Sequence, residues 1–168
     1  MRAEPGHRRR GRHPHLRNRI SRRHRWWLYR CSSLLFASGV GWLAGHYALR
    51  GDDLISQGAP HPSEVWWLRL HGAALLGFLV AFGALLPRHI ADGWRHGLNR
   101  DSGLAVIAMV IVLTLTGYGL YYATGDTIHG WVSVVHWSIG LGSFAALIWH
   151  VVRGRSLSAG AHRRERLN

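Results

Sequence analysis

Four histidines lie within two long apolar stretches of this 168-residue chain, and histidine is the residue there best suited to chemistry. A neutral imidazole binds iron, copper or zinc, and an ionisable group in an apolar setting needs a partner. His136 and His150 are two heptads apart in the stretch 130–152, GWVSVVHWSIGLGSFAALIWHVV. His71 and His89 are five helical turns apart in the stretch 65–90. Both stretches therefore carry one histidine near each end.

Helical geometry pairs these histidines across two helices. At about 100° per residue, positions two heptads apart differ by only about 40°, and positions five turns apart share one face. His71 and His136 both lie about six residues inside the start of their stretches, so parallel helices would bring them to one depth. His89 and His150 pair in the same way. The rise from His71 to His89 is about 27 Å and that from His136 to His150 is about 21 Å. His89 and His150 therefore meet only with helix tilt or a bend near Pro87.

Two neutral imidazoles on facing helices are the ligand set of a low-spin b-type haem. Cys31 is the only cysteine, which excludes an intramolecular disulfide, a cysteine-ligated iron–sulfur cluster and covalent c-type haem. Arg69 is a candidate partner for a haem propionate, because an arginine in an apolar stretch needs an anion. The expected site residues are His71 and His136 for one haem iron, His89 and His150 for a second, and Arg69 for a propionate.

The sequence predicts an all-α integral membrane protein with a four-helix transmembrane bundle. Each apolar stretch has about the 20 residues that a membrane-spanning helix needs. The third stretch has no histidine and is expected to be mostly scaffold, while Gly41 and Gly45 in the first predict close helix packing or room for a porphyrin. The expected spans are 27–49, 65–90, 103–123 and 130–152, within a membrane domain 26–153 that follows a disordered basic arm 1–25 and precedes a basic tail 154–168.

The positive charge indicates a membrane topology. The net charge is +13, and all 21 basic residues are arginines. The arm 1–25, the connection 88–101 and the segment 153–168 hold 18 of them. The positive-inside rule then places both termini in the cytoplasm of a multi-pass protein, surrounded by the lipid bilayer of the bacterial inner membrane. Nucleic acid is not an expected partner, because these arginines flank the apolar stretches.

The sequence resembles a known family in its histidine- and glycine-bearing runs. The runs WLRLHGAALLG, LPRH, LTGYGLYY and VVHWSIGLGSFAALIWHVVRG resemble small bacterial cytochrome b561-like proteins. They are also similar to the b-type cytochrome subunits of nickel–iron hydrogenases and the gamma subunits of formate dehydrogenases. The resemblance covers about Arg30 to Arg155. It implies electron transfer between a quinone pool and a partner redox protein through one or two haems b, with the four histidines as ligands.

Two other functions remain open on the sequence. The chain is either a haem-free membrane anchor or assembly subunit of a respiratory complex, or a histidine-relay transporter of protons or metal ions. The spans contain no aspartate or glutamate, which disfavours the relay. The sequence predicts an electron-transfer protein or an oxidoreductase subunit rather than a stand-alone enzyme. His46, near the end of the first span, is an interfacial histidine, a rival ligand or a quinone contact.

Overall fold

The computed structural model describes residues 20–49, 60–96 and 99–167, and all its regular elements there are helices. The expected arm 1–25 therefore lies mostly outside the described residues. The all-α prediction is confirmed for the described part of the chain. The elements in chain order are α1 Arg22–Leu43, η2 Ala44–Ala48, α2 Ser63–Gly83, η3 Leu86–Ile90, α3 Ala91–His96, α4 Arg100–Tyr122 and α5 Asp126–Leu167, where η marks a π-helical turn.

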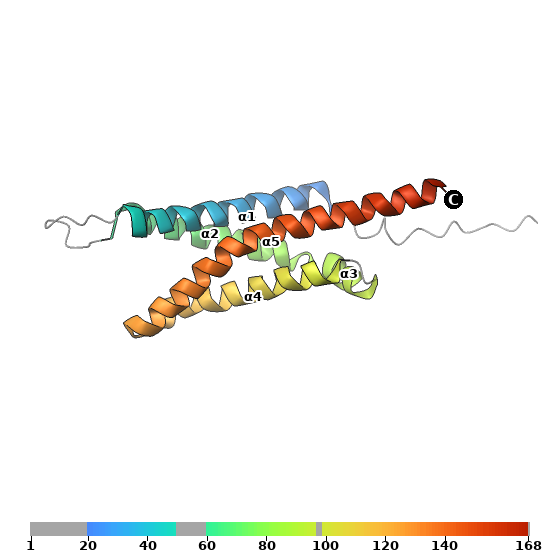
Figure 1. The fold of residues 1–168 in the computed structure, drawn as a ribbon. Helices are drawn as coiled ribbons and strands as arrows, with labels where there is room; N and C mark the ends of the chain where they lie inside the picture. The colour runs from blue at the N-terminus through green and yellow to red at the C-terminus, as the bar shows by residue number, and fades with distance from the viewer. Residues whose placement is uncertain (1–19, 50–59, 97–98, 168) are drawn as a thin grey trace, which may run out of the picture.

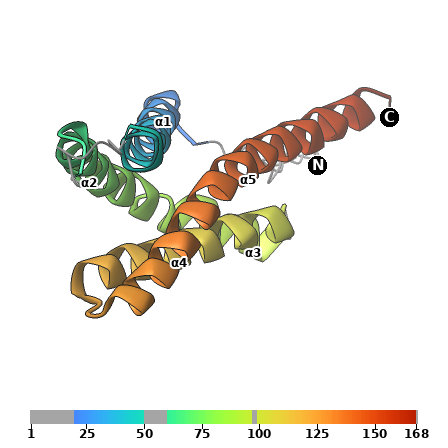
Figure 2. The same ribbon diagram turned by 60° about the vertical axis from the view of Figure 1, so that its left-hand side comes forward.

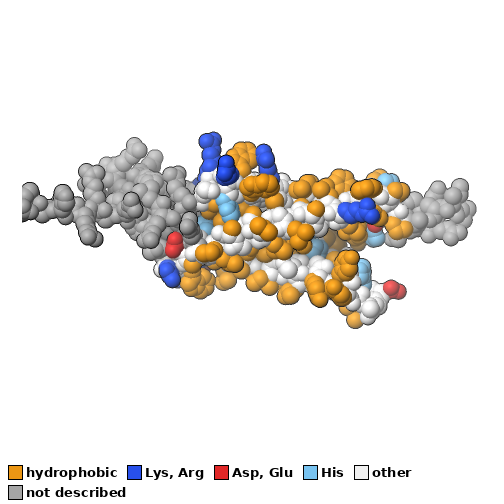
Figure 3. All heavy atoms as spheres, turned by 180° about the vertical axis from the view of Figure 1, so that it is seen from behind, with side chains coloured by type: hydrophobic (Ala, Val, Ile, Leu, Met, Phe, Trp, Pro, Cys, Tyr) orange, Lys and Arg blue, Asp and Glu red, His pale blue; other side chains and the backbone are white. Residues whose placement is uncertain are grey.

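Three of the described helices are long and apolar enough to cross a membrane. They are α2, α4 and the part of α5 from Asp126 to Leu157. Apolar side chains cover much of the face of the molecule that Figure 3 shows. Helix α1 is not among them, because its arginines, serines and glycines lower its mean hydropathy. Three of the four expected spans are thus supported by length and composition.

The helices form two antiparallel hairpins, α1 with α2 and α4 with α5 (Figures 1 and 2). Helix α5 also meets α1, where the rings of Phe36 and Phe144 stack with their centroids 4.3 Å apart. A Cβ atom at Gly41 would lie 2.6 Å from the Trp67 ring, so only glycine allows α1 to approach α2 this closely. The close-packing interpretation of Gly41 and Gly45 is confirmed at Gly41.

The second expected span is broken before its proline. Helix α2 ends at Gly83, and a turn leads into η3, which contains Pro87 and His89. The amide N–H groups of both His89 and Ile90 donate to the Leu85 carbonyl, at 2.9 Å and 3.2 Å. A proline has no N–H to donate and disfavours the helical conformation in the residue before it. The expected bend near Pro87 is therefore present.

Helix α5 does not end where the fourth span was expected to end. It continues past 152 to Leu167, so the basic segment after the span extends the same helix (Figure 1). Alanine, arginine, leucine and glutamate favour helix, and no proline interrupts this part of the chain. The basic tail expected at 154–168 is therefore helical up to Leu167.

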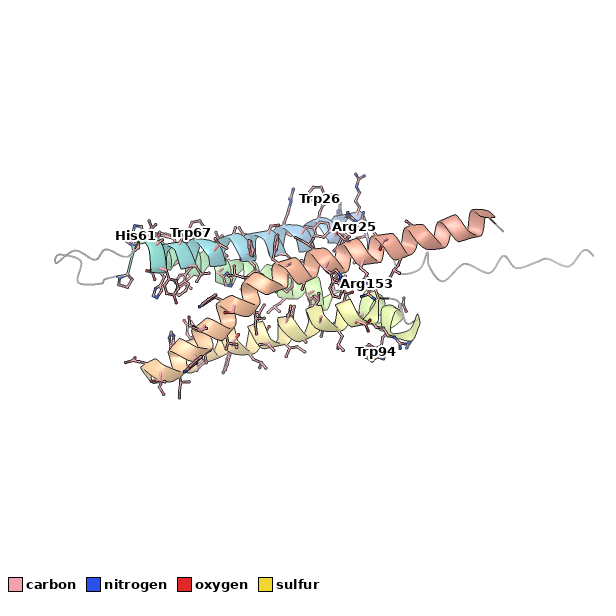
Figure 4. The ribbon with its side chains drawn as sticks, viewed as in Figure 1. Arg25, Trp26, His61, Trp67, Trp94 and Arg153 are labelled. Carbon is pink, nitrogen blue, oxygen red and sulfur yellow. The ribbon has the colours of Figure 1, made fainter. Side chains whose placement is uncertain are left out.

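The two ends of the molecule are distinguished by labelled residues in Figure 4. His61 and Trp67 lie at the end where α2 and α5 begin, called the His61 end. Trp26, Trp94 and Arg153 lie toward the opposite end, called the Trp94 end.

Candidate functional site

The structure brings the four histidines of the apolar stretches together in two pairs. The rings of His71 on α2 and His136 on α5 have centroids 6.3 Å apart and planes at 72°. The rings of His89 in η3 and His150 on α5 also have centroids 6.3 Å apart, with planes at 82°. We call these site A and site B. The pairing is the one that the spacing predicts, and the role of these residues as metal ligands stays a prediction.

The distance between the two ring centroids in each pair matches the distance expected for two imidazoles bound to one metal ion. Imidazole nitrogens bind metals at about 2.0–2.1 Å, and a nitrogen lies about 1.2 Å from its ring centroid, so a linear pair has centroids roughly 6.4 Å apart. A direct hydrogen bond of about 2.9 Å between the two rings would bring the centroids to roughly 5.2 Å. Edge-to-face packing of two rings is also compatible with the observed separation. The direction of the nitrogens therefore decides what each pair can do.

At site A, both imidazoles have a hydroxyl partner behind them. His71 Nδ1 lies 2.9 Å from the hydroxyl of Ser38, a fully buried residue on α1. His136 Nδ1 lies 2.8 Å from the hydroxyl of Thr116 on α4. The Ser38 hydroxyl donates to the carbonyl of Leu35, and the Thr116 hydroxyl donates to that of Val112.

These hydrogen bonds assign the tautomer. A hydroxyl that gives its single proton to a carbonyl can only accept from the imidazole, so Nδ1 carries the proton at both site A histidines. The lone pair is then on Nε2. A hydrogen bond at the second ring nitrogen is how metal-binding histidines are usually held in orientation, and it raises the basicity of the ligand. Site A thus consists of two imidazoles whose lone pairs are on Nε2, the nitrogen that a metal ion would need.

Site B is held by a hydroxyl and an amide. His150 Nδ1 lies 2.9 Å from the hydroxyl of Ser102, which is fully buried and donates to Asn99 Oδ1 at 2.5 Å. The Asn99 amide nitrogen lies 3.2 Å from both Nδ1 and the carbonyl oxygen of His150, and with Nδ1 protonated it donates to the carbonyl. Asn99 has φ of 51°, a left-handed conformation that asparagine tolerates better than most residues. Asn99, just before α4, therefore binds the backbone carbonyl of His150 and, through Ser102, orients the His150 ring.

Each of these hydroxyl residues is followed by a glycine that faces the same imidazole. A Cβ atom at Gly39 would lie 3.5 Å from His71 Cε1, one at Gly117 3.3 Å from His136 Cε1, and one at Gly103 3.7 Å from His150 Cε1. Larger side chains would crowd the imidazoles and whatever lies between them. The repeated unit is a hydroxyl residue and a glycine: Ser38–Gly39, Ser102–Gly103 and Thr116–Gly117.

The sequence analysis missed the role of α4, which it treated as scaffold. The signal was present, because Ser102 and Thr116 are two heptads apart, as are His136 and His150 on the antiparallel α5. Matched spacings on two antiparallel helices place Thr116 beside His136 and Ser102 beside His150. A hydroxyl does not itself bind haem iron, so a pattern of haem ligands in the sequence does not include these two residues.

Arg69 is not brought to either site. It is exposed, with its guanidinium carbon 5.0 Å from the centroid of the Trp66 ring, an arrangement typical of a cation–π contact. It lies two positions before His71, which is about 200° round the helix. Its contact with a propionate stays a prediction.

A further polar cluster lies at the His61 end. His46 Nδ1 is 3.1 Å from Glu64 Oε2, and Glu64 is only 6% exposed. The Trp42 ring stacks on the His46 ring with centroids 4.6 Å apart. The expected span began after Glu64, so the sequence did not mark this carboxylate as part of a site. Glu64 lies in the first turn of α2, where it contacts His46.

Within the described residues, no group of three or more histidine, cysteine, aspartate or glutamate side chains could hold a metal ion. Sites A and B each offer two protein ligands, which suits a metal whose other positions are filled by a cofactor. Comparison of the chain with protein-family models, curated proteins and solved structures finds no match in any of the three.

Proposed function

We propose that this protein is a membrane-bound b-type cytochrome that transfers electrons between a quinone pool and a partner redox protein. The observation that carries the proposal is the repetition of one arrangement, two imidazoles with centroids 6.3 Å apart, at both sites. The imidazoles of His71, His136 and His150 each have a hydroxyl partner at Nδ1, which leaves the lone pair on Nε2. The equal separations favour two haems, one at each site, over one.

The residues of the chain fit a bis-histidine haem in three respects. The ring separation admits one iron, the tautomers present lone pairs, and Gly39, Gly117 and Gly103 keep the edges of three imidazoles clear. When bound, haem supplies reversible one-electron chemistry between its ferric and ferrous states. Ser38, Thr116 and Ser102 would hold the imidazoles of His71, His136 and His150 neutral and in a fixed orientation around such a group.

The proposed setting is a four-helix bundle in the bacterial inner membrane. Helix α1 is the fourth span in this proposal, because it packs along α2 and ends in the same layer as the start of α2. The arginine distribution supports cytoplasmic termini, so the Trp94 end faces the cytoplasm and the His61 end faces outward. Sites A and B are two heptads apart along α5, a rise of about 21 Å, against a hydrocarbon core of about 30 Å.

The test is a reduced-minus-oxidised absorption spectrum of the purified protein, recorded with single histidine variants. We expect a b-type α band in the wild type, and a loss of about half of the haem in either His136→Ala or His150→Ala. His61→Ala is the matched control, since this histidine contacts Ser63 and lies in neither pair. A wild-type protein without a b-type band contradicts the proposal, and it would instead favour a haem-free anchor subunit.

A further inference from the structure

The His46–Glu64 pair is a buried acid–base pair that the proposed electron transfer does not use. Glu64 Oε2 contacts His46 Nδ1 at 3.1 Å, and Glu64 Oε1 accepts a hydrogen bond from the backbone N–H of His61 at 3.1 Å. Gly45 lies opposite, where a Cβ atom would come within 3.2 Å of the Glu64 side chain. The carboxylate is therefore held in place from three sides, with its charge directed at one imidazole.

His46 also borders a recess between the two hairpins. The recess has a volume of about 480 Å³ and lies between the end of α1, η2 and the start of α5. That volume is within the range of roughly 300–1,000 Å³ typical of small-molecule sites. His46 belongs to a π-helical turn, a distortion that is frequent at functional sites. The residues that line it and that matter here are Trp42, His46, Tyr47, Asp126, His129 and Trp131.

The recess lies next to site A along α5, and Glu64, the partner of His46, lies next to site A along α2. Glu64 precedes His71 by seven residues on α2, and His129 precedes His136 by seven residues on α5. Seven residues are almost two full turns, so each pair shares a helix face and is separated by about 10 Å of rise. A molecule in the recess would thus be a near neighbour of whatever site A binds.

The chemistry of the lining argues for a neutral aromatic ligand with hydroxyl groups. Trp42, Tyr47 and Trp131 offer flat apolar walls, while His46 and His129 offer ring nitrogens. The carboxylates of Glu64 and Asp126 disfavour an anion such as a haem propionate.

We propose that this recess binds the head group of a hydroquinone, with His46 Nε2 accepting the proton of one hydroxyl and Glu64 stabilising the imidazolium that results. The inference rests on the proposed function, which leaves the side of the quinone site open, and it assigns the site to the His61 end. Oxidation of a hydroquinone to a quinone breaks two O–H bonds and releases two protons and two electrons. The two electrons leave one at a time to two one-electron acceptors of the haem class, and the protons need a base.

His46 supplies that base without a buried, unpaired charge. Its Nδ1 proton is held by Glu64, so Nε2 is the nitrogen with a lone pair for the substrate hydroxyl. When Nε2 takes the proton, the positive imidazolium already has a negative partner 3.1 Å away. Asp126 and His129 line the same recess near the start of α5, where the second proton can pass to the His61 end.

The experiment uses the full-length protein in lipid nanodiscs and a short-chain benzoquinol as the probe. Three quantities are measured: haem content, equilibrium binding of the benzoquinol, and the rates of haem reduction by benzoquinol and by dithionite. The variants are His46→Gln, which removes the base, and Glu64→Gln, which keeps a hydrogen-bond partner without its charge. His61→Gln is the control, because His61 is at the same end and does not line the recess.

We expect His46→Gln to weaken benzoquinol binding about 5- to 10-fold, the loss of one hydrogen bond. Reduction by benzoquinol should slow about 100-fold or more, as is usual when a general base is removed. Glu64→Gln should slow the same reaction with a smaller effect on binding. Haem content and reduction by dithionite should not change in either variant, and His61→Gln should behave as the wild type.

Two results overturn the inference. One is benzoquinol binding and reduction that are unchanged in His46→Gln. The other is loss of haem from His46→Gln with proportional loss of binding, which would assign the recess to the haem itself. If the wild-type protein carries no haem but binds benzoquinol in a His46-dependent way, the proposed function fails while the binding site stands.

Discussion

Replacement of Thr116 by valine tests whether the hydroxyl behind His136 tunes site A. Valine has nearly the shape of threonine but cannot accept a hydrogen bond. In the wild type, the Thr116 hydroxyl oxygen accepts from His136 Nδ1–H at 2.8 Å. The change removes one hydrogen bond from a ring inside the helix pair and leaves the α4–α5 packing in place. It should therefore act on the electronic character of the imidazole rather than on the fold.

The magnitude follows from the strength of that hydrogen bond. A bond to Nδ1–H increases electron donation by the imidazole and stabilises ferric over ferrous haem. Hydrogen bonds to charged groups exceed those between neutral groups by about 1 kcal/mol. If the bond is stronger in the ferric state by that amount, its loss raises the reduction potential by roughly 40 mV, since about 59 mV corresponds to a factor of ten for one electron.

The assay is a spectroelectrochemical titration of wild type, Thr116→Val and Thr116→Ser. Site B lies on the same molecule and serves as an internal reference, because its His150 is held by Ser102 instead. The potential of one haem should rise in Thr116→Val and return close to the wild-type value in Thr116→Ser. Equal shifts of both haems, no shift at all, or a serine variant that behaves like valine would refute the reasoning.

Three other predictions concern packing and site B. Ser102→Ala should raise the potential of the other haem by a similar roughly 40 mV and leave site A unchanged in the same titration. His89→Ala should leave about one haem per chain, with a visible spectrum that keeps the site A component; loss of both haems would count against independent sites. Gly41→Val should destabilise the protein by about 1–3 kcal/mol, because a Cβ atom there would lie 2.6 Å from the Trp67 ring. Thermal unfolding measures this loss, with Gly72→Ala as the control because a Cβ atom at Gly72 meets no neighbour.

The pairing of the four histidines was predictable because it depends only on helical periodicity. Spacings of two heptads and of five turns place each pair on one helix face whatever the surrounding sequence. The offset between the two spacings also pointed to a distortion near Pro87. Its form, an α2 that stops at Gly83 followed by a π-helical turn, depends on contacts that periodicity does not describe.

The residues that support the histidines were not predictable in the same way. A serine or threonine in an apolar helix commonly bonds to a carbonyl in its own preceding turn, as Ser38 and Thr116 do. Only the placement of a second helix shows that the same oxygen also accepts from an imidazole. Glu64 was hidden for a related reason, since an acidic residue at a helix start is ordinarily explained by the helix dipole.

The orientation of Arg69 shows a limit of reasoning from proximity in sequence. Two positions before a histidine is close along the chain but opposite round the helix, and Trp66 provides the arginine with a partner. A residue three, four or seven positions away would have shared the face of His71. Glu64 satisfies that condition and Arg69 does not.

Electron paramagnetic resonance of the oxidised protein tests the central claim most directly. Ring planes at 72° and 82° within the two pairs are close to perpendicular. Perpendicular axial imidazoles give ferric haem a highly anisotropic low-spin signal, so two such signals of equal intensity are expected. His136→Ala should remove one and His150→Ala the other. A high-spin ferric signal in the wild type, or no haem signal, would contradict bis-histidine ligation at these sites.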